Sequence, residues 1–199
     1  MPDGVQAGPV DSLRAFVAIA IPESVRSRLQ RSQSRLRRLP VKVSWVRPEN
    51  IHLTLVFLGE IPTTALDSIQ DVLDDCAAPV APFEFAVFGL GLFGSRRAPR
   101  VIWAGIPEPP HDLLVLQDAL QERFLQAGWV RPMPLFHPHV TLGRIRGGQG
   151  AAQLTSVIAS ANNSDFGAVP VRRVQLVQSR LEADGVRYAL IHESGLKGT

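Results

Sequence analysis

Apolar residues recur along the chain with two different periods, and each period predicts one type of secondary structure. Short apolar runs are typical of β-strands, whereas apolar residues three and four positions apart are typical of amphipathic helices. The first pattern predicts strands over residues 13–20, 51–58, 83–93, 100–106, 136–145, 169–181 and 186–192, with a short extended piece over 44–47. The second predicts helices over residues 22–38, 62–78, 110–127 and 153–161.

The order of these elements repeats along the chain. Each half runs strand, helix, strand, helix, strand, and the second strand carries His-x-Thr: His52-Leu53-Thr54 and, 87 positions later, His139-Val140-Thr141. The separation between the opening strand and the motif is also nearly equal, from Leu13 to His52 and from Val101 to His139. This repetition predicts a duplication into two lobes that face each other across a cleft, with a crossing between the lobes near residues 95–99.

Strict alternation along a strand assigns the motif residues to one face. In the first copy, one face holds His52, Thr54, Val56 and Leu58, and an apolar face holds Ile51, Leu53, Leu55 and Phe57. In the second copy, His137, His139, Thr141 and Gly143 oppose Phe136, Pro138, Val140 and Leu142. Each motif therefore offers one imidazole beside one hydroxyl.

Two such faces brought together form a pocket that can move protons. Imidazoles have an ordinary pKa of about 6.5, so near neutral pH one of them can accept a proton while the other donates one. Threonine hydroxyls can donate hydrogen bonds to the nonbridging oxygens of a phosphate. This layout is suited to splitting a phosphate ester without a metal ion.

Composition limits the class of protein. The 199 residues, 45% of them hydrophobic, suffice for a single domain or two closely joined lobes. Residues 1–11 combine glycine, proline and acidic side chains, which predicts a flexible N-terminus rather than a secretion signal. The lone Cys76 has no partner for an internal disulfide, and no apolar run reaches membrane length. We therefore expect a soluble, cytoplasmic protein that does not bind membranes.

The net charge of +3 is unevenly distributed. Six arginines lie between Ser24 and Leu39 with no acidic residue among them: Arg26, Arg28, Arg31, Arg35, Arg37 and Arg38. They indicate either an anionic partner such as RNA or the solvated face of an ordinary helix. Charge alone does not separate these two interpretations.

Several segments around the motifs carry a family resemblance. They are residues 14–19 (RAFVAI), 45–50 (WVRPEN), 52–60 (HLTLVFLGE), 99–105 (PRVIWAG) and 136–142 (FHPHVTL). With these segments the chain resembles the 2H phosphoesterase superfamily, in the branch of RNA 2′,3′-cyclic phosphodiesterases historically called 2′-5′ RNA ligases. The resemblance extends over nearly the whole chain.

The resemblance implies a fold and a substrate class. We expect a bilobal α+β fold over residues 12–199, a pseudo-twofold duplication in which two antiparallel sheets line a central cleft and the helices lie outside. The substrate would be RNA ending in a 2′,3′-cyclic phosphate, or a small cyclic nucleotide, and the protein would act as a monomer with neither cofactor nor metal. The reverse reaction, 2′-5′ RNA ligation, uses the same chemistry.

The resemblance also assigns roles to residues. His52 would protonate the leaving O3′ as general acid, and His139 would activate water as general base, which leaves a 2′-phosphate. Thr54, Thr141 and Arg144 would bind the substrate phosphate. Strict alternation aims Arg144 away from His139, so this role requires a bend or bulge after Gly143; otherwise Arg144 is a solvated charge at the end of the strand.

Two other functions remain open at this stage. His137 and His139 have the spacing of metal ligands on a strand, so a metal-dependent hydrolase is possible if a third ligand such as His192 joins them. A non-catalytic module that binds RNA ends is the second alternative, because Phe16, Trp45, Trp103 and Tyr188 could stack on a terminal base. Phe16 and Trp103 also suit core packing, since they lie within apolar strands.

Overall fold

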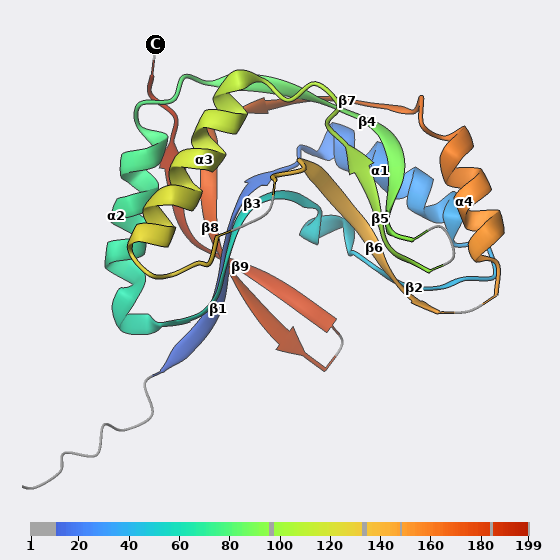
Figure 1. Ribbon diagram of the computed structural model, residues 1–199, viewed down its shortest axis with the longest axis horizontal. Helices are drawn as coiled ribbons and strands as arrows, with labels where there is room; N and C mark the ends of the chain where they lie inside the picture. The colour runs from blue at the N-terminus through green and yellow to red at the C-terminus, as the bar shows by residue number, and fades with distance from the viewer. Residues whose placement is uncertain (1–10, 96–97, 133–134, 148, 184, 199) are drawn as a thin grey trace, which may run out of the picture.

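The computed structural model describes residues 11–95, 98–132, 135–147, 149–183 and 185–198. Within these residues, nine strands form one curled antiparallel sheet in the order β7-β4-β5-β6-β3-β1-β8-β9, and β2 pairs with β6 (Figure 1). The strands are β1 (Ser12–Ala20), β2 (Lys42–Trp45), β3 (His52–Pro62), β4 (Phe83–Gly94), β5 (Pro99–Gly105), β6 (His139–Gly147), β7 (Asp165–Val171), β8 (Arg173–Glu182) and β9 (Gly185–Gly195).

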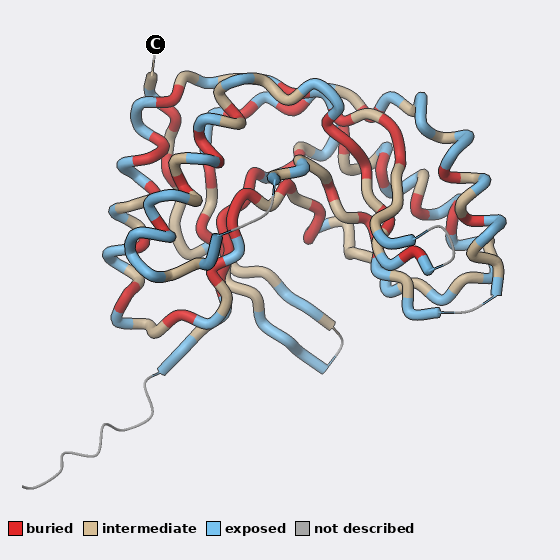
Figure 2. The backbone as a smooth tube through the Cα atoms, viewed as in Figure 1, coloured by how far each residue is buried: buried red, intermediate tan, exposed pale blue. Residues whose placement is uncertain are grey.

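In the described part of the chain, four α-helices pack against this sheet. They are α1 (Glu23–Leu36), α2 (Leu66–Ala77), α3 (His111–Gln126) and α4 (Ala151–Ser160), with short 3₁₀ turns η1 (Pro48–Asn50) and η2 (Thr63–Ala65). The helices α2 and α3 lie side by side against β3, β8 and β9, while α1 contacts β7 and α4 contacts β4 (Figure 1). Each helix buries one face, as the coloured tube in Figure 2 shows. In α3 the buried residues are Leu113, Leu116, Gln117, Leu120 and Phe124.

At the centre of the sheet, two neighbouring strands pair over a very short length. The strands β3 and β6 share a single residue pair, Leu53 opposite Val140, whereas β1 and β3 or β5 and β6 pair over many residues. One part of the sheet holds β1, β3, β8 and β9, and the other holds β2 and β4 to β7. The two expected sheets are therefore two parts of one hydrogen-bonded sheet.

The chain moves between these two parts at places that the sequence pattern did not indicate. The expected crossing at residues 95–99 is wrong, because β4 and β5 on either side of it pair with each other, with Gly94 opposite Pro99. Residues 169–181, expected as one strand, are two strands. The strand β7 ends at Val171 and pairs with β4, and after Arg172 the strand β8 pairs with β1 and β9. Arg172 and Arg173 interrupt the apolar run at this bend, and the buried positions change there from Val169 and Val171 to Val174 and Leu176.

Most other elements lie where the pattern predicts them, with shifted ends. The expected helix over 62–78 begins only at Leu66, because β3 extends to Pro62 and η2 follows it. The expected strand over 136–145 begins at His139, and residues 136–138 precede it in an irregular conformation. The predicted hairpin of β8 and β9 is confirmed, with Glu182 opposite Gly185. The flexible segment expected over residues 1–11 lies, up to residue 10, outside the described residues.

A buried glutamine side chain connects α1 to the second motif strand through hydrogen bonds. The Gln33 side chain is 2% exposed and donates hydrogen bonds to the carbonyl oxygens of Val46 and Leu142, each at 2.9 Å. The Val46 amide also donates to the Leu142 carbonyl. Cys76 is buried on α2, and none of the described helices is long and apolar enough to span a bilayer.

Candidate active site

The joint between β3 and β6 brings the two motifs together. The antiparallel pairing of Leu53 with Val140 sets His52 across from Thr141 and Thr54 across from His139. Leu53 and Val140 are fully buried, so their neighbours point to the opposite, partly exposed face of the sheet. Both imidazoles and both hydroxyls thus share one face, as the sequence predicts.

Each histidine is oriented by a carbonyl two residues before it. His52 Nδ1 lies 2.7 Å from the Asn50 carbonyl oxygen, and His139 Nδ1 lies 2.7 Å from the His137 carbonyl oxygen. Because a carbonyl only accepts, Nδ1 carries the proton and donates in both cases. Each Nε2 is therefore the nitrogen free to exchange a proton, and that of His52 lies 2.9 Å from Thr54 Oγ1, so the hydroxyl can donate to it.

Both imidazoles are partly buried, and burial lowers the pKa of each below its ordinary value. For His52 the hydrogen bond to the Asn50 carbonyl raises the pKa, and the nearby charge of His139 lowers it. For His139 the hydrogen bond to the His137 carbonyl raises the pKa, while the charges of Arg144 and His137 lower it. His139 is thus close enough to affect the protonation of His52.

Aromatic rings hold both imidazoles in place. Phe16 stacks on His52 with ring centroids 4.8 Å apart, and Tyr188 meets His52 edge-on at 5.3 Å. On the other side, Phe93 meets His139 edge-on at 4.7 Å, and Trp103 lies 6.5 Å away. Each imidazole therefore has two aromatic neighbours.

The four aromatic residues considered for base stacking have different surroundings. Phe16 is 3% exposed, which fits its expected core role, while Trp103 and Tyr188 are partly exposed. Trp45 lies under the Arg37 guanidinium at 5.2 Å from the ring centroid. Phe93, which contacts His139, was missed because alternation along an apolar strand does not show which ring meets a motif histidine.

A bulge decides the direction of Arg144. Between β5 and β6, Trp103 pairs with Thr141 and Ile102 pairs with Gly143, so Leu142 is an extra residue on β6. The extra residue resets the alternation, so that Leu142 and Gly143 are both buried and Arg144 is exposed on the side of Thr141. The bulge that the phosphate role requires is present, although it precedes Gly143 instead of following it.

The first motif strand has a bulge at the same point. Val17 pairs with Val56 and Ala18 pairs with Thr54, so Leu55 is an extra residue on β3. The faces predicted for this strand are therefore wrong beyond Leu55, which is buried as predicted. Val56 is 1% exposed, whereas Phe57, which alternation assigns to the core, is 58% exposed. Phe57 lies five residues after His52, just as Arg144 lies five residues after His139.

Arg144 lies between the second motif and the β8–β9 hairpin. Its charge lowers the pKa of His139, and together with Arg14 it lowers the pKa of Tyr188, against the larger effect of burial, which raises it. Arg144, Arg14 and Tyr188 line a common cavity of about 570 Å³. The structure therefore brings together His52, Thr54, His139, Thr141 and Arg144, the five residues expected at the site.

Among the described residues, the side chains that a metal site at His137 and His139 would need do not lie close together. The His192 Nε2 lies 2.9 Å from an Asp74 carboxylate oxygen, on the contact between β9 and α2. Among the described residues, no three histidine, cysteine, aspartate or glutamate side chains lie close enough to share a metal ion. His137 instead contributes its carbonyl to the orientation of His139.

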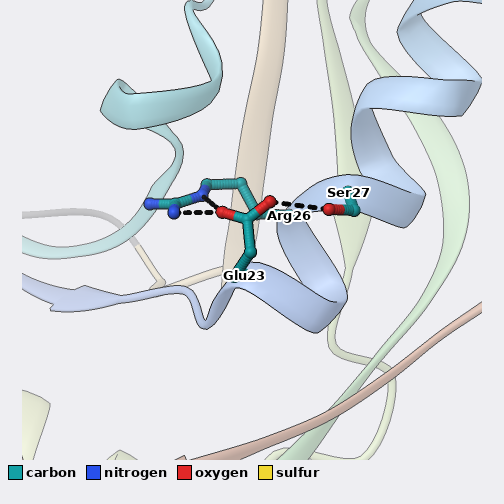
Figure 3. A network of polar contacts seen from close by, with 3 residues as sticks. All are labelled: Glu23, Arg26 and Ser27. Atoms are coloured by element: carbon teal, nitrogen blue, oxygen red, sulfur yellow. Dashed lines mark hydrogen bonds and ion pairs between the residues drawn. The ribbon is translucent and has the colours of Figure 1, made fainter.

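The arginine-rich segment forms α1 and the turn after it. Arg26 and Ser27 both contact the Glu23 carboxylate in the first turn (Figure 3). Arg26 also lines the cavity that contains His52. The other five arginines of the segment are all exposed: Arg28, Arg31, Arg35, Arg37 and Arg38. The segment therefore contributes one paired arginine to the surroundings of His52.

The same family matches both halves of the chain. The family model described as "LigT like Phosphoesterase" matches residues 19–103 and again residues 105–188. An RNA 2′,3′-cyclic phosphodiesterase of Methanothermobacter thermautotrophicus is 34% identical over 176 residues, which cover 88% of this chain and 95% of that protein. A protein of the same name from Archaeoglobus fulgidus is 30% identical over 176 residues, covering 88% and 96%.

Solved structures agree with these matches. TT0787 of Thermus thermophilus has a TM-score of 0.78 and 29% identity, covering 94% of this chain and 99% of its own. LigT of E. coli in complex with 3′-AMP has a TM-score of 0.78 at 24% identity, covering 94% and 99%, and supports the fold. From the family match over both halves and the 34% identity over most of the chain, we conclude that this protein belongs to the LigT-like phosphoesterase family.

Proposed function

We propose that this protein hydrolyses the 2′,3′-cyclic phosphate at the end of an RNA to a 2′-phosphate, without a metal ion. The observation that carries the proposal is the Leu53–Val140 pair, which sets two imidazoles and two hydroxyls on one face. Relatives that cover most of the chain bear the name RNA 2′,3′-cyclic phosphodiesterase, which supports the same substrate class.

The reaction needs two proton transfers. His139 takes a proton from water through Nε2 as the water oxygen forms a bond to phosphorus. The bond between phosphorus and O3′ breaks, and protonated His52 gives its Nε2 proton to O3′. The products are a 2′-phosphate and a free 3′-hydroxyl, so atoms and charge balance. The 2′-5′ ligation would use the same two histidines in the same roles, with an RNA 5′-hydroxyl in place of water: its oxygen bonds to phosphorus, O3′ leaves, and a 2′-5′ phosphodiester forms.

The remaining site residues act on the phosphate charge. Thr54 and Thr141 can donate to the nonbridging oxygens, and Arg144 adds a guanidinium on the same face. Negative charge on these oxygens must be held in the transition state, and losing one such donor costs about 3–4 kcal/mol in other enzymes.

Substrate binding would also adjust the protonation of the histidines. Burial keeps the pKa of both low in the free protein, yet the mechanism needs one imidazolium. An anionic phosphate between the imidazoles favours the charged form and so supplies the proton donor. Substrate binding and formation of the acid are therefore coupled.

We also propose that the fold arose by duplication and has a pseudo-twofold axis at the Leu53–Val140 pair. One family model matches two successive segments, and both motif strands carry a bulge three residues after the histidine. Both histidines also bond the carbonyl two residues earlier. We further propose that the protein acts as a cytoplasmic monomer, which the single buried cysteine, Cys76, suits.

The test uses an RNA oligonucleotide that ends in a 2′,3′-cyclic phosphate, incubated with the protein in excess EDTA. We expect conversion to the 2′-phosphate, identified by chromatography against both phosphate isomers. His52→Ala and His139→Ala should each lower kcat by about 10² or more. His111→Ala removes an exposed imidazole at the start of α3 and should leave turnover unchanged.

The alternatives have distinct outcomes in the same experiment. Loss of activity in EDTA with recovery on adding metal would favour the metal-dependent hydrolase of His137 and His139. Tight binding without turnover would favour the RNA-end binding module. Full activity in both histidine variants would refute the two-histidine mechanism.

A further inference from the structure

From its second turn onward, one face of α1 is basic and lies outside the site. By helical spacing it is opposite the buried stripe that includes Val25, Leu29 and Leu36, and it borders a hollow of about 440 Å³. We call it the α1 arginine face; its residues are Ser27, Gln30, Arg31, Ser34, Arg35 and Arg38. Because they are three or four positions apart, they follow one another along one side of the helix and of the turn after it.

The arginines of this face have no acidic partner. Arg31, Arg35 and Arg38 are exposed, and none of them forms an ion pair with a residue that the structure describes. Glu23, the one acidic residue of the helix, is bonded by Arg26 in the first turn. Arg31 and Arg35 lie one turn apart, and like charges at this spacing destabilise a helix. The face therefore collects positive charge at a cost to the helix itself.

The other described α-helices carry different charges. The helix α2 has four aspartates and no basic residue, α3 mixes both signs, and α4 is uncharged. In Figure 1, α2 lies at the left edge of the molecule and α1 lies in the right half. A surface that serves only solubility has both signs interspersed, as α3 does. The separation of basic α1 from acidic α2 instead attracts a polyanion to one side of the molecule and repels it from the other.

The basic helix begins beside the site. Arg26 in its first turn lines the cavity that contains His52. Arg35 follows Arg26 by nine residues, which corresponds to about 13 Å along the helix axis. A polynucleotide can extend over this distance, whereas a mononucleotide held at the site cannot.

The side chains of the face suit a phosphate backbone. Guanidinium groups bind phosphate oxygens, and the uncharged Gln30 and Ser34 suit phosphate and sugar oxygens. No aromatic or acidic residue is among the described residues that border the hollow, so no ring is present there on which a base could stack. A surface of this kind recognises the charge of a nucleic acid and not its sequence.

We propose that the α1 arginine face binds the phosphate backbone of an RNA substrate outside the site, away from the cyclic phosphate end. This inference rests on the proposed function and deepens it, because it makes RNA, and not a small cyclic nucleotide, the preferred substrate. The face acts on KM and not on kcat, since none of its residues lines the cavities of His52 and His139.

The test compares a hairpin RNA with a dinucleotide that ends in the same 2′,3′-cyclic nucleotide. The triple variant Arg31→Gln, Arg35→Gln, Arg38→Gln should raise KM for the hairpin by at least about tenfold and leave kcat and the dinucleotide KM unchanged. Binding of a hairpin that ends in a 3′-hydroxyl, measured without turnover, should lose about 2 in log–log salt slope, or about 0.7 for each phosphate released. Lysine at the same three positions keeps the charge and should retain most of the affinity.

The matched control removes three exposed arginines from the other part of the molecule. Arg123→Gln, Arg131→Gln and Arg173→Gln change the net charge by the same amount and should leave the hairpin KM unchanged, because charges beyond a Debye length of about 8 Å are screened at physiological salt. Thermal unfolding shows that both triple variants are folded. Removing like charges from α1 should not lower the Tm of the first.

The outcomes separate this inference from the proposed function. If the wild-type protein opens neither substrate, the proposed function fails, while binding of the 3′-hydroxyl hairpin still decides the role of the face. Equal affinity of the wild type and the α1 variant for that hairpin would refute the inference. So would an equal loss in the control, which shows an effect of net charge alone, or an equal loss with the dinucleotide. Tighter binding of polyglutamate than of the hairpin at the same salt would assign the face to an acidic protein instead.

Discussion

At the scale of single residues, the site depends on how each imidazole is held. One nitrogen is fixed by a carbonyl at 2.7 Å, and the other is left for chemistry. The sequence identifies both histidines by their repeated spacing to threonine. It does not identify the carbonyls of Asn50 and His137, because a backbone acceptor has no side-chain signature.

The lowered pKa values predict the pH dependence of the reaction. Since the pKa of His52 and of His139 both lie below the ordinary value of about 6.5, the free protein holds one proton between them only in acidic solution. The bell-shaped profile of kcat/KM should therefore have its maximum below about pH 6.5. Bound phosphate raises the pKa of the acid, so the basic limb of kcat should lie at higher pH than that of kcat/KM. An optimum of kcat/KM above about pH 7.5 would contradict this.

Arg144 should shift one limb of that profile. Its charge lowers the pKa of His139, so Arg144→Gln should raise that pKa. A base must be neutral, and the acidic limb of kcat/KM should then move to higher pH. Substrate KM should rise as well, because the phosphate loses the guanidinium that binds it. Arg146→Gln is the matched control for the acidic limb, since the charge of Arg144, and not that of Arg146, lowers the pKa of His139. An equal shift of the acidic limb in both variants would contradict the assignment.

At the scale of elements, the bulges in β3 and β6 determine which side chains face the substrate. One extra residue at Leu55 exposes Phe57, and one at Leu142 turns Arg144 toward the site. Alternation predicts faces correctly up to each bulge and wrongly beyond it. A bulge is set by the register against the neighbouring strands β1 and β5, which local sequence does not contain.

Gly143 allows β2 to approach β6 beside the bulge. A Cβ there would lie 2.6 Å from Val43 Cγ1 and 3.1 Å from the Trp45 ring. Gly143→Ala should therefore lower the free energy of unfolding by about 1–3 kcal/mol and reduce turnover by displacing Arg144. Gly195→Ala in β9 meets only the end of Lys197 at 3.9 Å and should change stability by less than about 0.5 kcal/mol. Denaturant titration of both variants checks this, and equal stabilities would contradict it.

At the scale of the whole molecule, one residue pair aligns the two parts of the sheet. Leu53 and Val140 are fully buried between the helices and the site, and each lies between the histidine and threonine of its motif. The packing of Leu53 and Val140 therefore sets the distance between the two imidazoles. The repeat in the sequence indicates that the motifs meet, and the register of the meeting comes from packing.

The variant Leu53→Ala tests whether the Leu53–Val140 pair aligns the two histidines as well as stabilising the fold. A cavity at this site should cost about 2–5 kcal/mol in the free energy of unfolding and should also lower kcat at temperatures where the protein is folded. Leu113→Ala in α3 empties an equally buried position outside the joint and should cost a similar free energy with kcat retained. Thermal unfolding and turnover measured on both variants check this; equal loss of kcat would show that the joint does not set the alignment.

The sequence by itself determined most of the strands and helices, the repeated motif and the family, because these follow from local periodicity and from residue types at fixed spacing. Tertiary structure decided the bulges, the single joint between β3 and β6, and the aromatic rings that pack on each imidazole. These features arise where residues far apart in the chain pack together, and their geometry depends on contacts that no local pattern records.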